Sequence, residues 1–168
     1  MAASLDGFIA DADGGYAWIP DEPDFDFTEL LAQFDTLLVG RRTLEEVPNV
    51  AADFPDKQVI VFSRTLRQAD HPSVTIVGEG MEDVVRDLKA SSGKDIWLYG
   101  GGELFRSLLT LGLVDTVEPA VMPVLLGGGR RLLPEARGPW KLVLTREQVY
   151  GKSGMVLLEY RVDYQQRV

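Results

Sequence analysis

DIWLYGGGELFRSLLTL, residues 95–111, is the stretch that decides the fold. Residues 96–99 are apolar or aromatic without interruption, which is typical of a strand covered on both faces. Leucines then recur at helical spacing over residues 104–111. The three glycines between strand and helix allow positive φ values and a close approach of the backbone to a ligand. A helix that begins after them offers free N–H groups to an anion, although the same glycines also suit a plain tight turn.

Three more apolar runs, at residues 36–40, 59–62 and 74–77, predict further strands before this one. Helical patterns alternate with them, which favours βαβ units and a largely parallel sheet with right-handed crossovers. Ligands of open α/β sheets bind outside the carboxyl ends of the strands. The segments that follow the four strands are RRT (41–43), SRT (63–65), GEG (78–80) and GGG (100–102). The sequence therefore predicts a groove with glycines and arginines along one sheet edge, which suits a dinucleotide with several phosphates.

The two ends of the chain have a different pattern. Residues 1–10 predict a strand that breaks at residues 5–7. A loop rich in Asp, Gly and Pro follows over residues 11–24, and a helix then buries Phe27, Leu30, Leu31 and Phe34. Residues 115–124 predict one long strand at an edge or with a kink, because it contains two prolines. Residues 140–150 and 155–163 alternate as the two strands of an antiparallel hairpin.

Composition limits the function classes. A chain of 168 residues with 45% hydrophobic and 26% charged residues predicts one globular domain, residues 1–168. A formal net charge of −9 argues against binding to nucleic acid or to a membrane surface. No apolar run is long enough to span a bilayer. Cysteine is absent, which fits a reducing cytoplasm. The lone histidine, His71, excludes a histidine metal cluster, so no metal is expected, and a hydrolase triad lacks its nucleophile motif.

The order of motifs resembles the dihydrofolate reductase superfamily. The motifs are ASLDGFIA (3–10), VGRRT (39–43), VFSRTL (61–66), YGGGE (99–103) and PVLLGGG (123–129). Among its branches, the chain is similar to the C-terminal reductase domain of the bifunctional riboflavin-biosynthesis deaminase-reductase and to stand-alone relatives of that domain. The resemblance covers essentially the whole chain. It implies a three-layer α/β fold with a mixed, mainly parallel eight-stranded sheet, flanking helices and a C-terminal antiparallel hairpin.

The resemblance also implies that NADPH lies across the carboxyl edge of the sheet. Cofactor-binding residues carried over from it are Gly40, Arg41, Arg42, Thr43, Ser63, Arg64, Gly78, Gly100, Gly101, Gly102 and Glu103. Gly100 to Gly102 would hold the pyrophosphate, and Arg64 would take a 2′-phosphate, which favours NADPH over NADH. In this superfamily the first two glycines are commonly joined by a cis peptide, so we expect one between Gly100 and Gly101. The G-x-G-x-x-G pattern of an ordinary Rossmann domain is absent.

The acceptor side is carried over with fewer residues. Asp24 would contact the acceptor and assist proton transfer, with Asp26 as the neighbouring alternative, and either carboxylate could instead only favour the helix dipole. Asp6 is a second catalytic candidate, or it only stabilises the break in the first strand. Leu5 would also line the acceptor site. In the loop over residues 11–24, Trp18 and Ile19 are the apolar residues that could line a site, and they could equally pack the loop on the core.

One position departs from the riboflavin branch, which usually has Lys or Arg after Ser-Leu-Asp-Gly. Phe8 stands there in this chain, which implies a less charged acceptor than a phosphorylated ribose. The resemblance thus predicts an NADPH-dependent reductase of a small pterin- or pyrimidine-like heterocycle, related to the reductase of riboflavin biosynthesis. The alternative is a nucleotide-binding module of the same fold without turnover. The hydrophobic hairpin would serve as a homodimer face, as in similar proteins.

Overall fold

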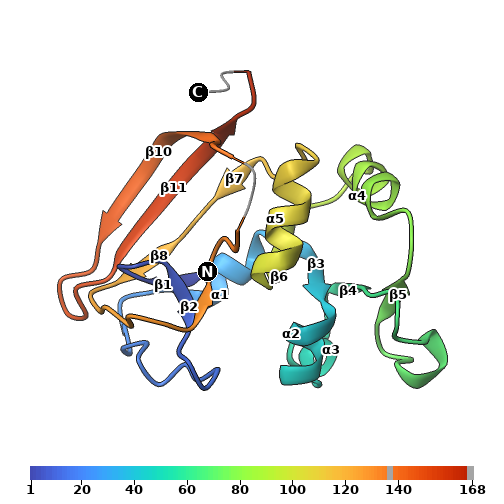
Figure 1. Ribbon diagram of the computed structural model, residues 1–168, viewed down its shortest axis with the longest axis horizontal. Helices are drawn as coiled ribbons and strands as arrows, with labels where there is room; N and C mark the ends of the chain where they lie inside the picture. Colours follow the sequence, from blue (N-terminus) through green and yellow to red (C-terminus); the bar gives the residue numbers. More distant parts are fainter. Residues whose placement is uncertain (136–137, 166–168) are drawn as a thin grey trace. The chain divides into compact units, whose positions relative to one another are not determined.

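The computed structural model describes residues 1–135 and 138–165. The chain divides into two compact units, Phe27–Leu113 and Met1–Asp26 with Val114–Val168 (Figure 1). We call Phe27–Leu113 the inserted unit, because it interrupts the sequence of the other, which we call the terminal unit. The prediction of a single domain over residues 1–168 stays a prediction. No helix within the described residues is long and apolar enough to cross a membrane.

The inserted unit contains a parallel sheet of four strands in the order β5-β4-β3-β6. The strands are β3 (Phe34–Gly40), β4 (Gln58–Phe62), β5 (Thr75–Val77) and β6 (Asp95–Gly100). Leu37, Val39 and Val61 on the two central strands are fully buried, as expected where both faces of a sheet are covered. The predicted strands and their parallel arrangement are confirmed.

The helices of the inserted unit are α1 (Phe27–Ala32), α2 (Arg41–Glu46), α3 (Val50–Asp53), the 3-10 helix η1 (Gln68–Asp70), α4 (Met81–Ala90) and α5 (Gly102–Thr110). Helices α4 and α5 pack their apolar faces as predicted from helical spacing. On α5, Leu104, Leu108 and Leu109 are buried. Helices α3 and η1 were not predicted, because three or four residues are too few to show a helical period.

The prediction for the first helix is wrong in part. Phe27 is 50% exposed, and Phe34 belongs to β3, where it pairs with Asp95. Both rings contact Trp97 instead, with Phe34 stacked on it at 5.3 Å and Phe27 edge-on at 6.4 Å between centroids. Helix α1 ends at Ala32, so the aromatic residue two positions later packs from the sheet.

The terminal unit is built from both ends of the chain. Its larger sheet has the order β1-β8-β11-β10, with β7 also paired to β11 (Figure 1). A two-stranded sheet joins β2 to β9. The strands are β1 (Ala2–Ser4), β2 (Phe8–Ala10), β7 (Thr116–Val117), β8 (Ala120–Met122), β9 (Arg130–Arg131), β10 (Lys141–Val149) and β11 (Val156–Asp163). Strands β1 and β8 are parallel, and β10 and β11 form the predicted antiparallel hairpin.

The prediction of one eight-stranded sheet needs correction. The described strands form sheets of four, five and two strands, and the mainly parallel character holds only in the inserted unit. The first strand breaks at residues 5–7 as predicted, but its second part pairs with β9, which sequence analysis missed. The long strand predicted at 115–124 is two short strands, because Pro119 between them has no N–H for a ladder.

Candidate functional site

Four strand ends of the inserted unit lie at one edge of its sheet. Gly40 pairs with Phe62, Phe62 pairs with Val77, and Val39 pairs with Gly100, all in parallel register. The segments that follow these strands therefore leave the sheet at the same edge. The structure thus brings together every residue that the sequence assigned to cofactor binding, from Gly40 to Glu103.

Glycines form a tight backbone junction at this edge, where β3 and β6 end. A Cβ on Gly40 would lie 3.4 Å from the carbonyl oxygen of Gly100, and one on Gly101 would lie 3.3 Å from Oγ1 of Thr43. Gly100 has a φ of +150°, which side chains rarely allow. The Gly100–Gly101 peptide is cis, as expected from the resemblance. The positive φ of Gly100 and the close approach of Thr43 to Gly101 both favour glycine at this junction.

Helix α5 begins directly at this junction. Gly101 is its N-cap, and no side chain caps the helix there. The carbonyl of Gly101 accepts the N–H of Phe105 at 3.1 Å, so the helix is continuous from its first turn. Glu103 in that turn pairs with Arg106 at 2.5 Å. The N–H groups of a first helical turn have no intrahelical acceptor and can bind an anion.

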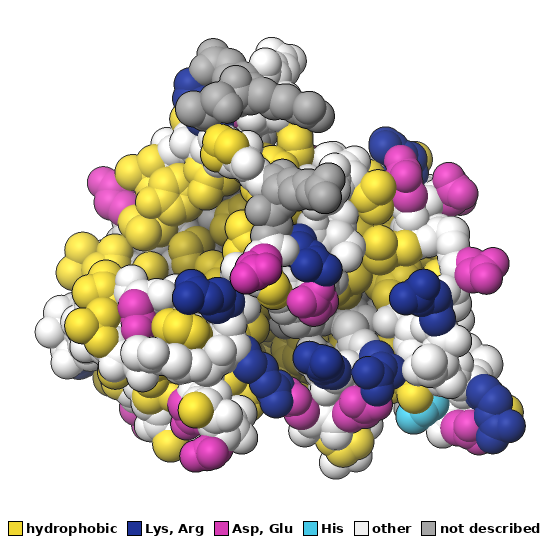
Figure 2. All heavy atoms as spheres, in the orientation of Figure 1, with side chains coloured by type: hydrophobic (Ala, Val, Ile, Leu, Met, Phe, Trp, Pro, Cys, Tyr) yellow, Lys and Arg dark blue, Asp and Glu magenta, His cyan; other side chains and the backbone are white. Residues whose placement is uncertain are grey.

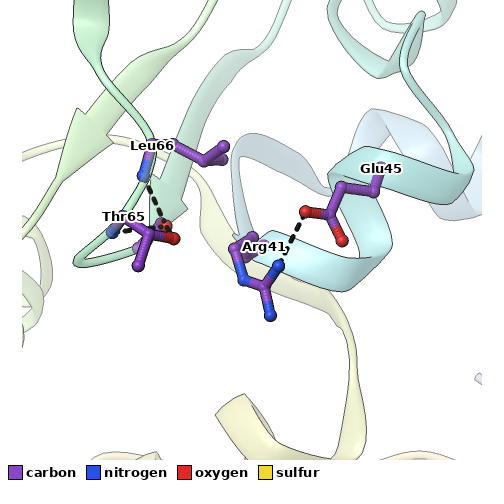
Figure 3. A network of polar contacts seen from close by, with 5 residues as sticks. Arg41, Glu45, Thr65 and Leu66 are labelled. Carbon is purple, nitrogen blue, oxygen red and sulfur yellow. Dashed lines mark hydrogen bonds and ion pairs between the residues drawn. The ribbon is translucent and has the colours of Figure 1, made fainter.

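Three predicted arginines lie along the same edge, and they differ in their partners. Arg41 pairs with Glu45 at 2.8 Å on α2 (Figure 3). Arg42 and Arg64 are exposed, and neither has an ion pair or side-chain hydrogen bond within the described part of the chain. Two of the three guanidinium groups are therefore available to an anionic ligand.

Ser63 shapes the turn after β4. Its buried Oγ accepts the N–H groups of Thr65 at 3.2 Å and Leu66 at 3.1 Å (Figure 3). Its own N–H donates to the carbonyl of Val77 at 3.0 Å, and Gly78 lies against the Ser63 carbonyl. The hydroxyl group thus holds the loop that presents Arg64.

Asp6 of the terminal unit joins two loops. Its carboxylate accepts the Ser4 hydroxyl at 2.6 Å and the N–H groups of Leu126 at 3.1 Å and Gly127 at 2.8 Å. The Ser4 hydroxyl group, followed by these N–H groups, lowers the pKa of Asp6 to about 2. Of the two roles predicted for Asp6, these contacts favour the structural one, in which Asp6 stabilises the break between β1 and β2.

The carboxylates before α1 bind the turn of the C-terminal hairpin. Asp24 pairs with Lys152 at 2.7 Å, and this hydrogen bond raises the pKa of Lys152. Glu22 accepts the Ser153 hydroxyl at 2.6 Å and the Ser153 N–H at 3.1 Å, and the hydroxyl contact lowers the pKa of Glu22. Both members of the Asp24–Lys152 pair are more than half exposed. The roles of Asp24 and Asp26 in proton transfer stay predictions.

The two predicted apolar residues of the acceptor site have different surroundings. Leu5 is 67% exposed in the break between β1 and β2. Trp18 is half-buried and packs against a cluster that contains Met122, Tyr150 and Met155, while its Nε1 donates to the carbonyl of Gly15 at 3.1 Å. Its contacts favour the packing role, whereas Leu5 is accessible to a ligand.

Sequence analysis missed Arg131. This exposed residue lies on β9, and its Cζ is 5.1 Å from the centroid of the Phe8 ring. The only local signal was the Arg130–Arg131 dipeptide after a triple glycine. Its position opposite Phe8 depends on pairing across more than 120 residues, which no short pattern reveals.

Comparison with known proteins agrees with this architecture. Residues 1–156 match the family model of the RibD C-terminal domain. The chain is 34% identical over 173 residues to the uncharacterized protein YyaP of Bacillus subtilis (strain 168), covering 95% of this chain and 91% of YyaP.

Solved structures extend the comparison to the fold. A crystal structure of a protein assigned to riboflavin biosynthesis, from Shewanella sp. PV-4, matches with a TM-score of 0.82 and 30% identity, covering 97% of this chain and 96% of that one. Dihydrofolate reductase from Enterococcus faecalis, in complex with NADP(H), matches with a TM-score of 0.69 and 18% identity, covering 96% of this chain and 93% of that one. The chain therefore belongs to the RibD C-terminal domain family, a reductase-type family with the dihydrofolate-reductase-like α/β fold.

Proposed function

We propose that the protein is an NADPH-dependent oxidoreductase that transfers hydride to a small pterin- or pyrimidine-like heterocycle. The observation that carries this proposal is the carboxyl edge of the inserted sheet. Gly40, Gly100 and Gly101 carry no side chain that would cover the backbone there, and Arg42 and Arg64 have no carboxylate partner among the described residues. Membership of a reductase-type family supports hydride transfer as the reaction.

The residues of this edge fit a dinucleotide. We assign the pyrophosphate to Gly100–Glu103, because α5 begins there with uncapped N–H groups. The segment Gly40–Thr43 would hold a further part of the cofactor near the nicotinamide. Arg64 would bind the 2′-phosphate next to Ser63 and Gly78, since a guanidinium group suits a phosphate bidentately. The reduced nicotinamide would supply hydride, and the protein orients the two reactants.

On the acceptor side we propose Asp24 and Leu5, with Trp18 supporting the loop. An exposed ion pair contributes little to stability, so an acceptor with N–H groups can replace Lys152 at the Asp24 carboxylate. Leu5 would contact the apolar face of the heterocycle. Asp6 would hold the strand break rather than transfer a proton, because its carboxylate already accepts three hydrogen bonds.

The test compares NADPH with NADH on single variants. Arg64→Ala should weaken NADPH binding by roughly tenfold to a hundredfold and NADH binding by less than about threefold, because only NADPH carries the 2′-phosphate. The matched control is Arg67→Ala, which removes an arginine that is 81% exposed and already paired with Asp70 at 3.0 Å. Equal losses for both cofactors in Arg64→Ala would remove this assignment.

A second candidate is a nucleotide-binding module without turnover. It is favoured by the terminal unit, where Asp6 and Asp24 already have partners. Thermal stabilisation by NADPH without its oxidation across a panel of heterocycles would establish this alternative. Oxidation with any member of the panel would exclude it.

We also propose that the protein is a homodimer, located in the cytoplasm. Strand β10 lies at the end of its sheet, and hydrophobic side chains gather over the β10–β11 hairpin (Figure 2). Leu142, Leu144 and Val149 on β10 are 40%, 48% and 70% exposed. A second copy would cover this edge, because an exposed apolar edge strand otherwise invites aggregation. Leu144→Glu should give a monomer in light scattering, and an unchanged mass would contradict the proposed face.

A further inference from the structure

The guanidinium group of Arg131 lies over the ring of Phe8, with Cζ 5.1 Å from the ring centroid. Phe8 is 7% exposed, so its ring is fixed in the interior and acts as a platform. Arg131 itself is exposed. A cation over an aromatic face is attracted by the negative charge of that face, which favours this position of the Arg131 side chain.

A contact with an aromatic ring uses none of the N–H donors of a guanidinium group in a hydrogen bond to oxygen. The group's five N–H donors point outward in the plane and suit the oxygens of a carboxylate or phosphate. Within residues 1–135 and 138–165, Arg131 has no ion pair and no side-chain hydrogen bond. Arg131 shares this lack of a carboxylate partner with Arg42 and Arg64, and it differs from them in its contact with an aromatic ring. The ring contact thus favours one position of a cation whose hydrogen-bond donors are available.

The backbone around this pair is fixed by strand pairing. Phe8 pairs with Arg131 and Ala10 pairs with Arg130. Two steps along β2 therefore correspond to one step along β9, which is a β-bulge in β2. Ile9 is the extra residue of this bulge, and both arginines therefore oppose buried residues of the same face of β2. The N–H of Leu132 also donates to the carbonyl of Gly7 at 2.9 Å. Arg131 is thereby held beside the strand break that contains Leu5.

The neighbouring Arg130 lies close to a different part of the chain, the loop that contains Gly14. A nitrogen of the Arg130 guanidinium group would lie 3.0 Å from a Cβ on Gly14, so this side chain lies close to the loop over residues 11–24. The two guanidinium groups therefore have different surroundings. Arg131, over an aromatic ring, is the one placed to receive a ligand.

We propose that Arg131, positioned by Phe8, binds an anionic group of the acceptor, either a phosphate or a carboxylate. This proposal rests on the proposed function, which places the acceptor beside Leu5 in the strand break. It reverses the expectation that Phe8 implies a less charged acceptor. The residue at position 8 carries no charge itself, but it positions a cation that comes from β9.

The test uses inorganic phosphate, acetate and chloride as separate probes, at constant ionic strength and with NADPH present to saturate the cofactor edge. Amide and arginine side-chain signals are followed by NMR in the full chain. We expect phosphate or acetate, but not chloride, to shift the signals of residues 130–132. The anion that binds more tightly, phosphate or acetate, identifies the anionic group of the acceptor as a phosphate or a carboxylate. Arg131→Gln should weaken this binding by about tenfold.

Two further variants separate positioning from charge. Phe8→Leu keeps an apolar core residue but removes the ring, and it should weaken anion binding by about threefold. Arg161→Gln on β11 removes one exposed charge elsewhere in the terminal unit and should leave the affinity unchanged. Equal affinity in Arg131→Gln and wild type, or shifts confined to other residues, would overturn the proposal. NADPH affinity is measured in the same samples, so a failure of cofactor binding is seen independently of the result at Arg131.

Discussion

The charged residues of the two units differ in what they contact. At the carboxyl edge of the inserted sheet, Arg42 and Arg64 are exposed and have no ion-pair partner among the described residues. In the terminal unit, Asp6 binds Ser4 and two N–H groups, and Asp24 pairs with Lys152. The cofactor edge of the inserted unit therefore presents cations that a ligand can neutralise, whereas Asp6 and Asp24 of the terminal unit already have partners within the protein.

This difference shows that residue type alone does not identify a catalytic group. A carboxylate that accepts several hydrogen bonds is stabilised in its charged form and is a poor proton donor near neutral pH. An arginine without a partner keeps its donors for an incoming anion. The following predictions test this comparison, in order of decreasing effect.

The largest effect is expected at the glycine junction. Gly100→Ala places a side chain on a residue with a φ of +150°, which should cost about 1–3 kcal/mol of stability. Displacement of the junction should also weaken NADPH binding by roughly a hundredfold. Thermal unfolding and cofactor titration measure the two effects. Gly151→Ala is the control, because a Cβ there meets nothing within 4 Å. Wild-type affinity in Gly100→Ala would mean that the junction does not hold the cofactor.

The next effect concerns the acceptor. Asp24→Asn should lower kcat/KM for the acceptor by about tenfold, because a charged hydrogen-bond acceptor is lost, and should leave NADPH affinity unchanged. Steady-state kinetics with a heterocycle that supports turnover measures this change. Lys152→Met should retain activity, since it removes only the present partner of Asp24. If Asp26→Asn were the impaired variant instead, the alternative carboxylate would be the functional one.

A smaller effect concerns stability against pH. The pKa of Asp6 lies at about 2 in the folded protein, below its value of 3.8 in the unfolded chain. The stabilising contribution of Asp6 is therefore complete above pH 3.8 and is lost as the pH falls toward 2. Asp6→Asn should lower the unfolding midpoint at neutral pH and remove this acid-dependent component. A wild-type pH profile in the variant would assign the acid sensitivity to other carboxylates.

The smallest effect is expected for the paired arginine of the inserted unit. Arg41→Ala should change NADPH affinity by less than about threefold, because Arg41 is exposed and already pairs with Glu45. Arg42→Ala should have the larger effect, since Arg42 has no such partner in the described chain. Fluorescence titration with NADPH gives the dissociation constant of each variant, and the two constants are compared with that of the wild type. A larger loss of NADPH affinity in Arg41→Ala than in Arg42→Ala would show that the ion pair with Glu45 does not keep Arg41 from binding the cofactor.

Much of the inserted unit could be predicted from the sequence. Continuous apolar runs such as residues 59–62 are local signals, and so are the leucine spacing of α5 and the glycines at 100–102. Parallel strands place their following loops at one edge, so the convergence of Gly40, Arg64 and Gly101 followed from strand order. A local pattern was sufficient there because the geometry of βαβ units is itself nearly fixed.

The terminal unit shows what only tertiary structure decided. Its sheet joins β1 to β8 and β2 to β9, and these pairs link residues more than 115 positions apart. Leu126 and Gly127 at Asp6, Lys152 at Asp24 and Arg131 at Phe8 all come from such distant segments. The roles of these three residues therefore could not be read from neighbouring residues alone. The sequence by itself determined the four parallel strands of the inserted unit and the glycines that follow them. The long-range pairing decided which charges are neutralised within the chain and which remain for a ligand, because that outcome depends on distances that only the folded chain sets.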